Sequence, residues 1–182
     1  AASSGTMPPR PLHKHLMTDQ PTASTPPAAP RAAATVVMLR DGTAGLEVFM
    51  VRRHGLSDVL GGTYVFPGGK VDPDDTQLQP HQNLDQDPEL LRTSLGEPDQ
   101  ELNVLQATAL YVAAVREAFE ECGVLFAHGP GVAGPIDGAE VATCCRAGHS
   151  FNDAVAALGL RLHTQALMPW SRWITPAKSP IM

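Results

Sequence analysis

REAFEECGV, residues 116–124, carries more information about this chain than any other stretch of its sequence. Positions i, i+3 and i+4 of an α-helix share a face, so Glu117, Glu120 and Glu121 would project together while Phe119 points towards the core. Like charges on one turn repel each other by about a few tenths of a kcal/mol per pair. A hard divalent cation would remove that repulsion, because it prefers carboxylate oxygens. Taken alone, however, the string is more typical of a solvated acidic turn on a surface helix.

The residues before this string predict the helix that carries it. Apolar side chains recur there at spacings of three and four. They are Leu102, Leu105, Ala109, Val112, Val115 and Phe119. This spacing predicts one apolar face of an amphipathic helix, and Gly123 is a natural residue for its C-terminal end.

A second informative stretch is YVFPGGKVD, residues 64–72. Residues 64–66 predict a brief strand that stops at the Pro-Gly-Gly turn. The adjacent Gly68 and Gly69 allow a tight turn and a close approach of the backbone to a ligand. On its own this is a generic turn.

Together the two stretches resemble the Nudix box, G-x5-E-x7-R-E-U-x-E-E-x-G-U, in which U is aliphatic. Gly69 fits the first glycine, and residues 116–124 fit the second half, with Ala118 at an aliphatic position. Asp75 stands where the family has Glu. Forty residues, 76–115, separate the two halves instead of seven. We therefore expect an insertion of 33 residues inside the box, over about 76–108.

Such an insertion is similar to one branch of the family, that of nucleoside diphosphate-linked moiety X motif 19. That branch also has an FPGG-like turn followed by Asp, REAFEE, and a downstream Trp-x-x-Trp-x-Thr-Pro element, here WSRWITP at residues 170–176. The resemblance covers about 33–176. It implies an α/β (α+β) fold, the Nudix α/β/α sandwich around a mixed sheet, in which the box forms loop-helix-loop.

The resemblance also implies an activity, the metal-dependent hydrolysis of a nucleoside diphosphate linked to another moiety. Mg²⁺ or Mn²⁺ on the diphosphate would neutralise developing charge and help to generate the nucleophile. The implied metal ligands are Glu117, Glu120 and Glu121. Arg116 would orient these glutamates, and Gly68 and Gly69 would shape the loop that supports the helix. No general base is assigned, because this residue varies within the family.

The implied substrate is coenzyme A or an acyl-CoA, because characterised relatives of this branch resemble coenzyme A diphosphatases. Their coenzyme A motif is matched in part. Arg53, a candidate phosphate ligand, and Gly62 fall at its Arg and Gly positions, whereas His54 and Asp58 replace Ser and a second Arg. An acidic Asp58 opposite a polyanion is unfavourable. Two alternatives stay open: a hydrolase of ADP-ribose or dinucleotides such as NADH, and a catalytically silent Nudix-fold binding module.

Aromatic and sulfur-containing residues give weaker indications. Tyr64, Trp170 and Trp173 could stack on a nucleobase, with core or interface packing as an equal alternative. The chain has three cysteines, Cys122, Cys144 and Cys145. An odd count with two adjacent members does not suit a disulfide framework, so we interpret them as reduced thiols. Cys122 is expected to act as a small buried hydrophobe.

Composition narrows the class of partner. The formal net charge of -6 argues against a general nucleic-acid binder, and no apolar run approaches the roughly 20 residues of a membrane span. Twelve of the 19 acidic residues lie between 70 and 121. We expect a small-molecule nucleotide-diphosphate substrate and allow for a homodimer. The expected compartment is a bacterial cytoplasm, or a peroxisome or mitochondrion in a eukaryote.

The remaining sequence predicts how the chain is organised. Residues 1–33, rich in Ala and Pro, should form a disordered tail, in part from a vector, before a Nudix domain over 34–182. Predicted strands cover 35–40, 46–52, 64–66 and 124–126, and a helix capped by Ser150 covers about 150–158. Residues 76–96 are expected to be mostly irregular. Relatives continue with a further strand, so we expect a C-terminally incomplete sheet.

Overall fold

The structure is a computed structural model, and it describes residues 31–54, 61–96, 102–130 and 136–173. Three expectations lie at least partly outside these residues. They concern the tail before residue 31, Asp58, and the end of the WSRWITP element.

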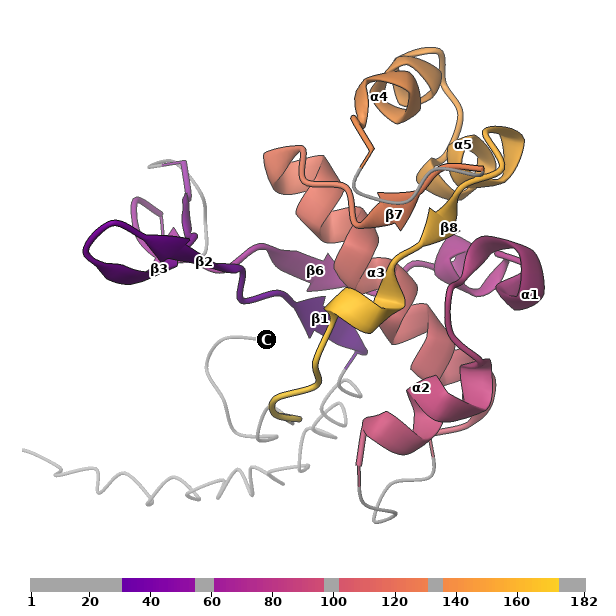
Figure 1. The fold of residues 1–182 in the computed structure, drawn as a ribbon, viewed down its shortest axis with the longest axis horizontal. Coiled ribbons are helices and arrows are strands. Elements are labelled where there is room, and N and C mark those ends of the chain that lie inside the picture. Colours follow the sequence, from indigo (N-terminus) through magenta and orange to yellow (C-terminus); the bar gives the residue numbers. More distant parts are fainter. Residues whose placement is uncertain (1–30, 55–60, 97–101, 131–135, 174–182) are drawn as a thin grey trace, which may run out of the picture.

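Helix α3 (Val104–Cys122) is the central element of the described fold (Figure 1). Asn103 caps its first turn by accepting a hydrogen bond from the Gln106 amide at 2.8 Å, and the Gln106 side chain accepts one from the Asn103 amide. Gly123 ends it in the left-handed conformation, with φ 73°. The predicted helix and its glycine stop are confirmed, and the apolar face is buried from Ala109 onwards. The first two positions of that face were wrong, because Leu102 precedes the helix and Leu105 is 55% exposed.

Two strands and one short helix pack against α3. Strand β1 (Ala33–Thr35) pairs antiparallel with β6 (Gly68–Lys70), and the 3-10 helix η1 (Pro73–Thr76) follows. The Val36 amide also donates to the Pro67 carbonyl at 2.8 Å. A Cβ atom on Gly68 would collide with the β1 backbone. The glycine is therefore needed because two strands approach closely here.

The two N-terminal strands predicted over 35–40 and 46–52 form a hairpin, but each of them is divided. Strand β2 (Leu39–Gly42) pairs with β3 (Gly45–Val48), and β4 (Val51–Arg52) pairs with β5 (Tyr64–Val65). The continuous strands expected over 35–40 and 46–52 are thus wrong in detail. The first strand is divided because its two parts have different partners: β1 pairs with β6, and β2 pairs with β3. The second strand is divided for the same reason, since β3 pairs with β2 and β4 pairs with β5. That hairpin projects away from α3 (Figure 1).

The expectation that 76–96 is mostly irregular is wrong. It contains α1 (Pro80–Asn83) and α2 (Pro88–Ser94), each with a proline in its first turn. Asp87 caps α2 by accepting from the Glu89 amide at 2.8 Å. Helix α2 packs on α3, where Leu91 is fully buried. Helices this short show no readable hydrophobic period, so only their Asp-Pro and Gln-Pro starts could have revealed them.

Beyond α3, a second strand pair and two more helices complete the described fold. These elements are β7 (Ala127–His128), α4 (Ala139–Arg146), α5 (Phe151–Ala157), β8 (Arg161–Leu162) and the 3-10 helix η2 (Thr164–Ala166). Ser150 caps α5, which confirms the predicted helix. The strand expected at 124–126 lies later, at β7, because pairing with β8 begins only at Ala127.

The mixed α/β class is confirmed. Among the described residues, the strands pair as four two-stranded antiparallel ladders, and one parallel bridge joins Leu84 to Leu162. Apolar side chains from α2, α3, α5 and β8 form one core, which includes Leu91, Val112, Val115, Val155 and Leu162. The three cysteines form no disulfide. In the part of the chain that the structure describes, no helix is long and apolar enough to cross a membrane.

Candidate active site

The two halves of the divided box meet at Arg116. Its Nε donates to Asp75 Oδ1 at 2.9 Å and its Nη2 to Asp75 Oδ2 at 3.0 Å, across a sequence separation of 41 residues. Two parallel hydrogen bonds of this kind form the bidentate arginine–carboxylate arrangement. Asp75 is 1% exposed, and its carboxylate also accepts from the Asp72 amide at 2.8 Å. The shorter Asp side chain therefore reaches Arg116 from η1.

The remaining donors of Arg116 serve the glutamate turn and β6. Nη1 donates to Glu117 Oε1 at 2.9 Å and to Glu120 Oε2 at 3.0 Å. Nη2 donates to the Lys70 carbonyl oxygen at 2.9 Å. Together with the two bonds to Asp75, these contacts use all five N–H donors of the guanidinium. Arg116 thus fixes the end of α3 to β6 and η1 and has no donor left for a ligand.

The guanidinium of Arg116 stays positively charged despite its burial. Burial disfavours the cation, but the hydrogen bonds and charges of Asp75, Glu117 and Glu120 outweigh burial and raise the guanidinium pKa. Arg116 therefore stays protonated at any working pH.

The two glycines before the site have different contacts. The Gly68 amide donates to Glu121 Oε2 at 3.0 Å, which holds the third glutamate against β6. A Cβ atom on Gly69 would collide with the Glu117 carboxylate. Gly69 thus leaves the space that Glu117 occupies, and the Pro-Gly-Gly turn and the glutamate turn fit together as one unit.

The donor set suits a hard cation. Four carboxylates lie within 4.0 Å of the single guanidinium, the farthest being Asp72 at 3.8 Å, so negative charge is in excess. Burial, together with repulsion from Glu120 and Glu121, raises the pKa of Glu117 in spite of its ion pair with Arg116. A cation would relieve that repulsion and keep Glu117 ionised.

The three glutamates do not yet converge on one point. In the described part of the chain, they do not bring one oxygen each to within 4.8 Å of one another. Arg116 holds Glu117 and Glu120, while the Gly68 amide holds Glu121. Glu120 and Glu121 are exposed on the helix end, where rotation of their side chains is unhindered by the core.

Other predicted site residues lie elsewhere. Arg53 is exposed beside the β4–β5 ladder, and its amide donates to the Thr63 carbonyl at 2.9 Å. Tyr64, Trp170 and Trp173 are 62%, 93% and 84% exposed. The alternative that these aromatic rings pack in the core of the described chain is therefore wrong. Stacking on a ligand and packing at an interface both remain predictions.

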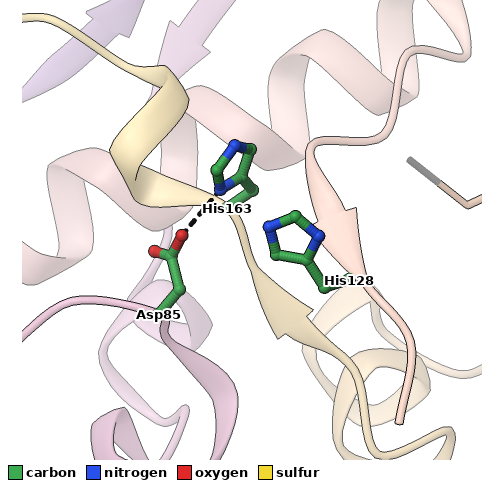
Figure 2. Close-up of side chains that lie close together, drawn as sticks. All are labelled: Asp85, His128 and His163. Atoms are coloured by element: carbon green, nitrogen blue, oxygen red, sulfur yellow. Dashed lines mark hydrogen bonds and ion pairs between the residues drawn. The ribbon is translucent and has the colours of Figure 1, made fainter. Parts of the chain in front are cut away.

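The sequence did not reveal a second polar cluster, formed by Asp85, His128 and His163 (Figure 2). Its members come from the α1–α2 connection, from β7 and from the residue after β8. No spacing motif relates them, and only the fold brings them together.

The fold and the reassembled box are those of the Nudix family. A family model described as the NUDT19 Nudix domain matches residues 21–182, and the chain belongs to this family. Its structure is similar to the crystal structure of a NUDIX hydrolase from Alicyclobacillus acidocaldarius, with a TM-score of 0.58 and 31% identity. The match covers 83% of this chain and 64% of that chain, so the chain spans less than two thirds of this relative. No curated protein matches.

Proposed function

We propose that this chain cleaves the diphosphate bond of a nucleoside diphosphate linked to another moiety, with coenzyme A or an acyl-CoA as the leading substrate. The observation that carries the proposal is the buried pair between Arg116 and Asp75. It fastens the glutamate turn at the end of α3 to η1, while the Gly68 amide of the Pro-Gly-Gly turn holds Glu121. A solvated acidic turn on an ordinary surface helix would have no need of such a buried anchor.

Each residue of the site has a distinct part in this proposal. Mg²⁺ or Mn²⁺ held by Glu117, Glu120 and Glu121 would neutralise the charge that develops on the diphosphate. Arg116 orients Glu117 and Glu120 and does not contact substrate, because its donors are all engaged. The Gly68 amide orients Glu121, and Gly69 leaves room for Glu117.

The leading substrate is supported by the β4–β5 ladder. Arg53 and Gly62, the two matched positions of the coenzyme A motif, are joined by a hydrogen bond from the Gly62 amide to the Arg53 carbonyl at 3.2 Å. The next pair in the ladder, Arg52 and Tyr64, adds a second guanidinium and a ring that is 62% exposed. A guanidinium and an exposed ring opposite each other in the ladder suit a phosphorylated adenine nucleotide.

The decisive assay offers coenzyme A, ADP-ribose and NADH separately, with and without Mg²⁺ or Mn²⁺, and follows products by chromatography. We expect metal-dependent release of 3',5'-ADP and 4'-phosphopantetheine from coenzyme A. Glu121→Gln should lower the rate by about two orders of magnitude, since losing about 3 kcal/mol of charge stabilisation has that effect. The matched control is Glu89→Gln on α2, an exposed helix glutamate, which should leave the rate unchanged.

The other outcomes separate the alternatives. Cleavage of ADP-ribose or NADH but not of coenzyme A would keep the chemistry and replace the substrate. Metal binding without turnover of any of the three substrates would contradict the proposal that the chain hydrolyses such diphosphates. It would favour a Nudix-fold binding module.

A further inference from the structure

A polar cluster separate from the glutamate turn gathers metal-ligating atoms from three parts of the chain. His163 Nδ1 lies 2.7 Å from Asp85 Oδ2, and the imidazole rings of His128 and His163 meet edge to face with centroids 4.2 Å apart (Figure 2). One ligand atom from each residue lies within 4.8 Å of the other two. Among the described residues, no other set of three His, Cys, Asp or Glu side chains meets this condition.

Backbone hydrogen bonds fix where these three side chains begin. His128 is in β7, opposite Arg161 of β8. The His163 amide donates to the Phe126 carbonyl at 2.9 Å, and the Asp85 amide donates to the Leu162 carbonyl at 3.2 Å. The backbone of all three residues is therefore held by the β7–β8 strand pair, so the cluster does not depend on the conformation of a separate loop.

The Asp85 carboxylate is itself oriented. Its Oδ1 accepts from the Thr164 amide at 2.8 Å and from the Thr164 hydroxyl at 2.6 Å. These bonds fix the carboxylate so that Oδ2 faces His163. Support of this kind around a ligating group is typical of metal sites, where outer hydrogen bonds orient the ligands.

A plain structural explanation covers only part of the cluster. Asp85 caps the turn that begins at Thr164, and His163 could simply hydrogen-bond to the same carboxylate. That explanation accounts for Asp85 and His163. The His128 ring, which approaches from the other strand of the pair, brings a third ligand atom to the same place.

We propose that Asp85, His128 and His163 bind a divalent transition-metal cation of the Zn²⁺ class, which fastens the α1–α2 connection to the β7–β8 ladder. Two imidazoles and one carboxylate are donors that suit Zn²⁺, whereas an all-carboxylate set suits Mg²⁺. Zn²⁺ bonds of about 2.0–2.2 Å place tetrahedral ligand atoms roughly 3.3 Å apart. Small rotations of the side chains would reach that separation.

The first test titrates Zn²⁺ alone into the chelator-treated full chain by calorimetry, with Co²⁺ absorption as a second probe. The background is a Glu120→Gln, Glu121→Gln double variant, so that binding at the glutamate turn does not contribute. We expect one equivalent to bind, and we expect His128→Ala or His163→Ala to weaken binding at least tenfold. The matched controls are the exposed histidines, His81→Ala and His149→Ala, which should bind as the background does.

Several results would overturn the proposal. They are an absence of binding in the background protein, full binding in the His128→Ala variant, and loss of binding in a Cys144→Ser, Cys145→Ser variant. Diphosphatase activity is measured in a separate assay, so failure of either proposal leaves the other standing.

A second measurement uses the wild-type protein, so its result does not depend on whether the variants fold. Nitrogen NMR of the wild-type histidine rings should show Zn²⁺ shifting one ring nitrogen each of His128 and His163, while His81 and His149 keep their resonances. Shifts confined to the other histidines would contradict the assignment.

Discussion

Two carboxylates in one stretch of the chain, Asp75 and Asp85, fasten that stretch to distant partners in different ways. Asp75 is fully buried and forms a bidentate ion pair with Arg116 of α3. Asp85 has a side chain 12% exposed, and it accepts hydrogen bonds mainly from Thr164 beside the β7–β8 ladder. The first contact joins two halves of a recognisable motif, whereas the second joins segments that share no motif.

The two contacts also differ in the free energy that is lost when the carboxylate is removed. A buried ion pair contributes little net free energy, but removal of one partner leaves an uncompensated buried charge and is very costly. Removing a carboxylate that accepts mainly from a neutral amide and hydroxyl costs less, since its hydrogen bonds are lost without leaving a buried guanidinium short of acceptors. Burial would raise the pKa of Asp85, yet the hydrogen bonds from Thr164 and His163 outweigh burial and lower it. The Asp85 carboxylate is therefore held as an anion, and removing it should have a smaller consequence than removing Asp75.

The largest effect is expected from Asp75→Ala. This change leaves the Arg116 guanidinium buried with two donors unmatched, so we expect the free energy of unfolding to fall by about 3–5 kcal/mol. Urea denaturation followed by circular dichroism measures it. The control is Asp74→Ala, an exposed neighbour in the same short helix, which should cost less than about 1 kcal/mol. Similar losses in both variants would show that Arg116 does not depend on Asp75.

Sequence reasoning succeeded where the information is local. The periodic apolar face and Gly123 were sufficient to predict α3, and Ser150 was sufficient to predict the start of α5. The Pro-Gly-Gly turn could be recognised as a close approach, although not as an approach to β1 in particular. These features depend on residues within a few positions of one another.

Pairing over long distances was only partly predictable. The resemblance placed Asp75 and Arg116 in the same motif but predicted no contact between them, and no local pattern indicates a bond across 41 residues. The cluster of Asp85, His128 and His163 had no signal at all, because its members meet only after β7 pairs with β8. Short helices such as α2 also gave no hydrophobic period, which is why 76–96 was expected to be irregular.

The packing of α2, which follows Asp85 in the chain, provides an intermediate test. Leu91 is fully buried against the core, whereas its neighbour Leu90 is 59% exposed. Leu91→Ala should lower the free energy of unfolding by about 2–5 kcal/mol, because it removes a large apolar group and leaves a cavity. Leu90→Ala should change it by less than about 0.5 kcal/mol.

Urea denaturation of the Leu90 and Leu91 variants compares them directly. Equal and small losses would mean that α2 is not packed into the core, and that Pro88–Ser94 is as irregular as the sequence suggested.

The smallest effect is expected at Asp85, and it must be measured in the presence of a chelator. Asp85→Ala removes the acceptor for the Thr164 amide and hydroxyl, so we expect a loss of about 1–3 kcal/mol in the free energy of unfolding. Asp85→Asn keeps one oxygen for Thr164 and should lose less. A loss at Asp85→Ala as large as that at Asp75→Ala would remove the distinction between the two contacts.

Adding Zn²⁺ to the same denaturation series should enlarge the difference in unfolding free energy between the wild type and the Asp85 variants. A cation at 100 times its dissociation constant stabilises the folded state by about 2.7 kcal/mol. The wild type should gain that stability, whereas Asp85→Asn should gain much less, because an amide oxygen is a weaker ligand for Zn²⁺ than a carboxylate. Equal gains in both proteins would mean that the carboxylate at Asp85 serves only to cap the turn at Thr164, and that any Zn²⁺ bound by the chain is held elsewhere.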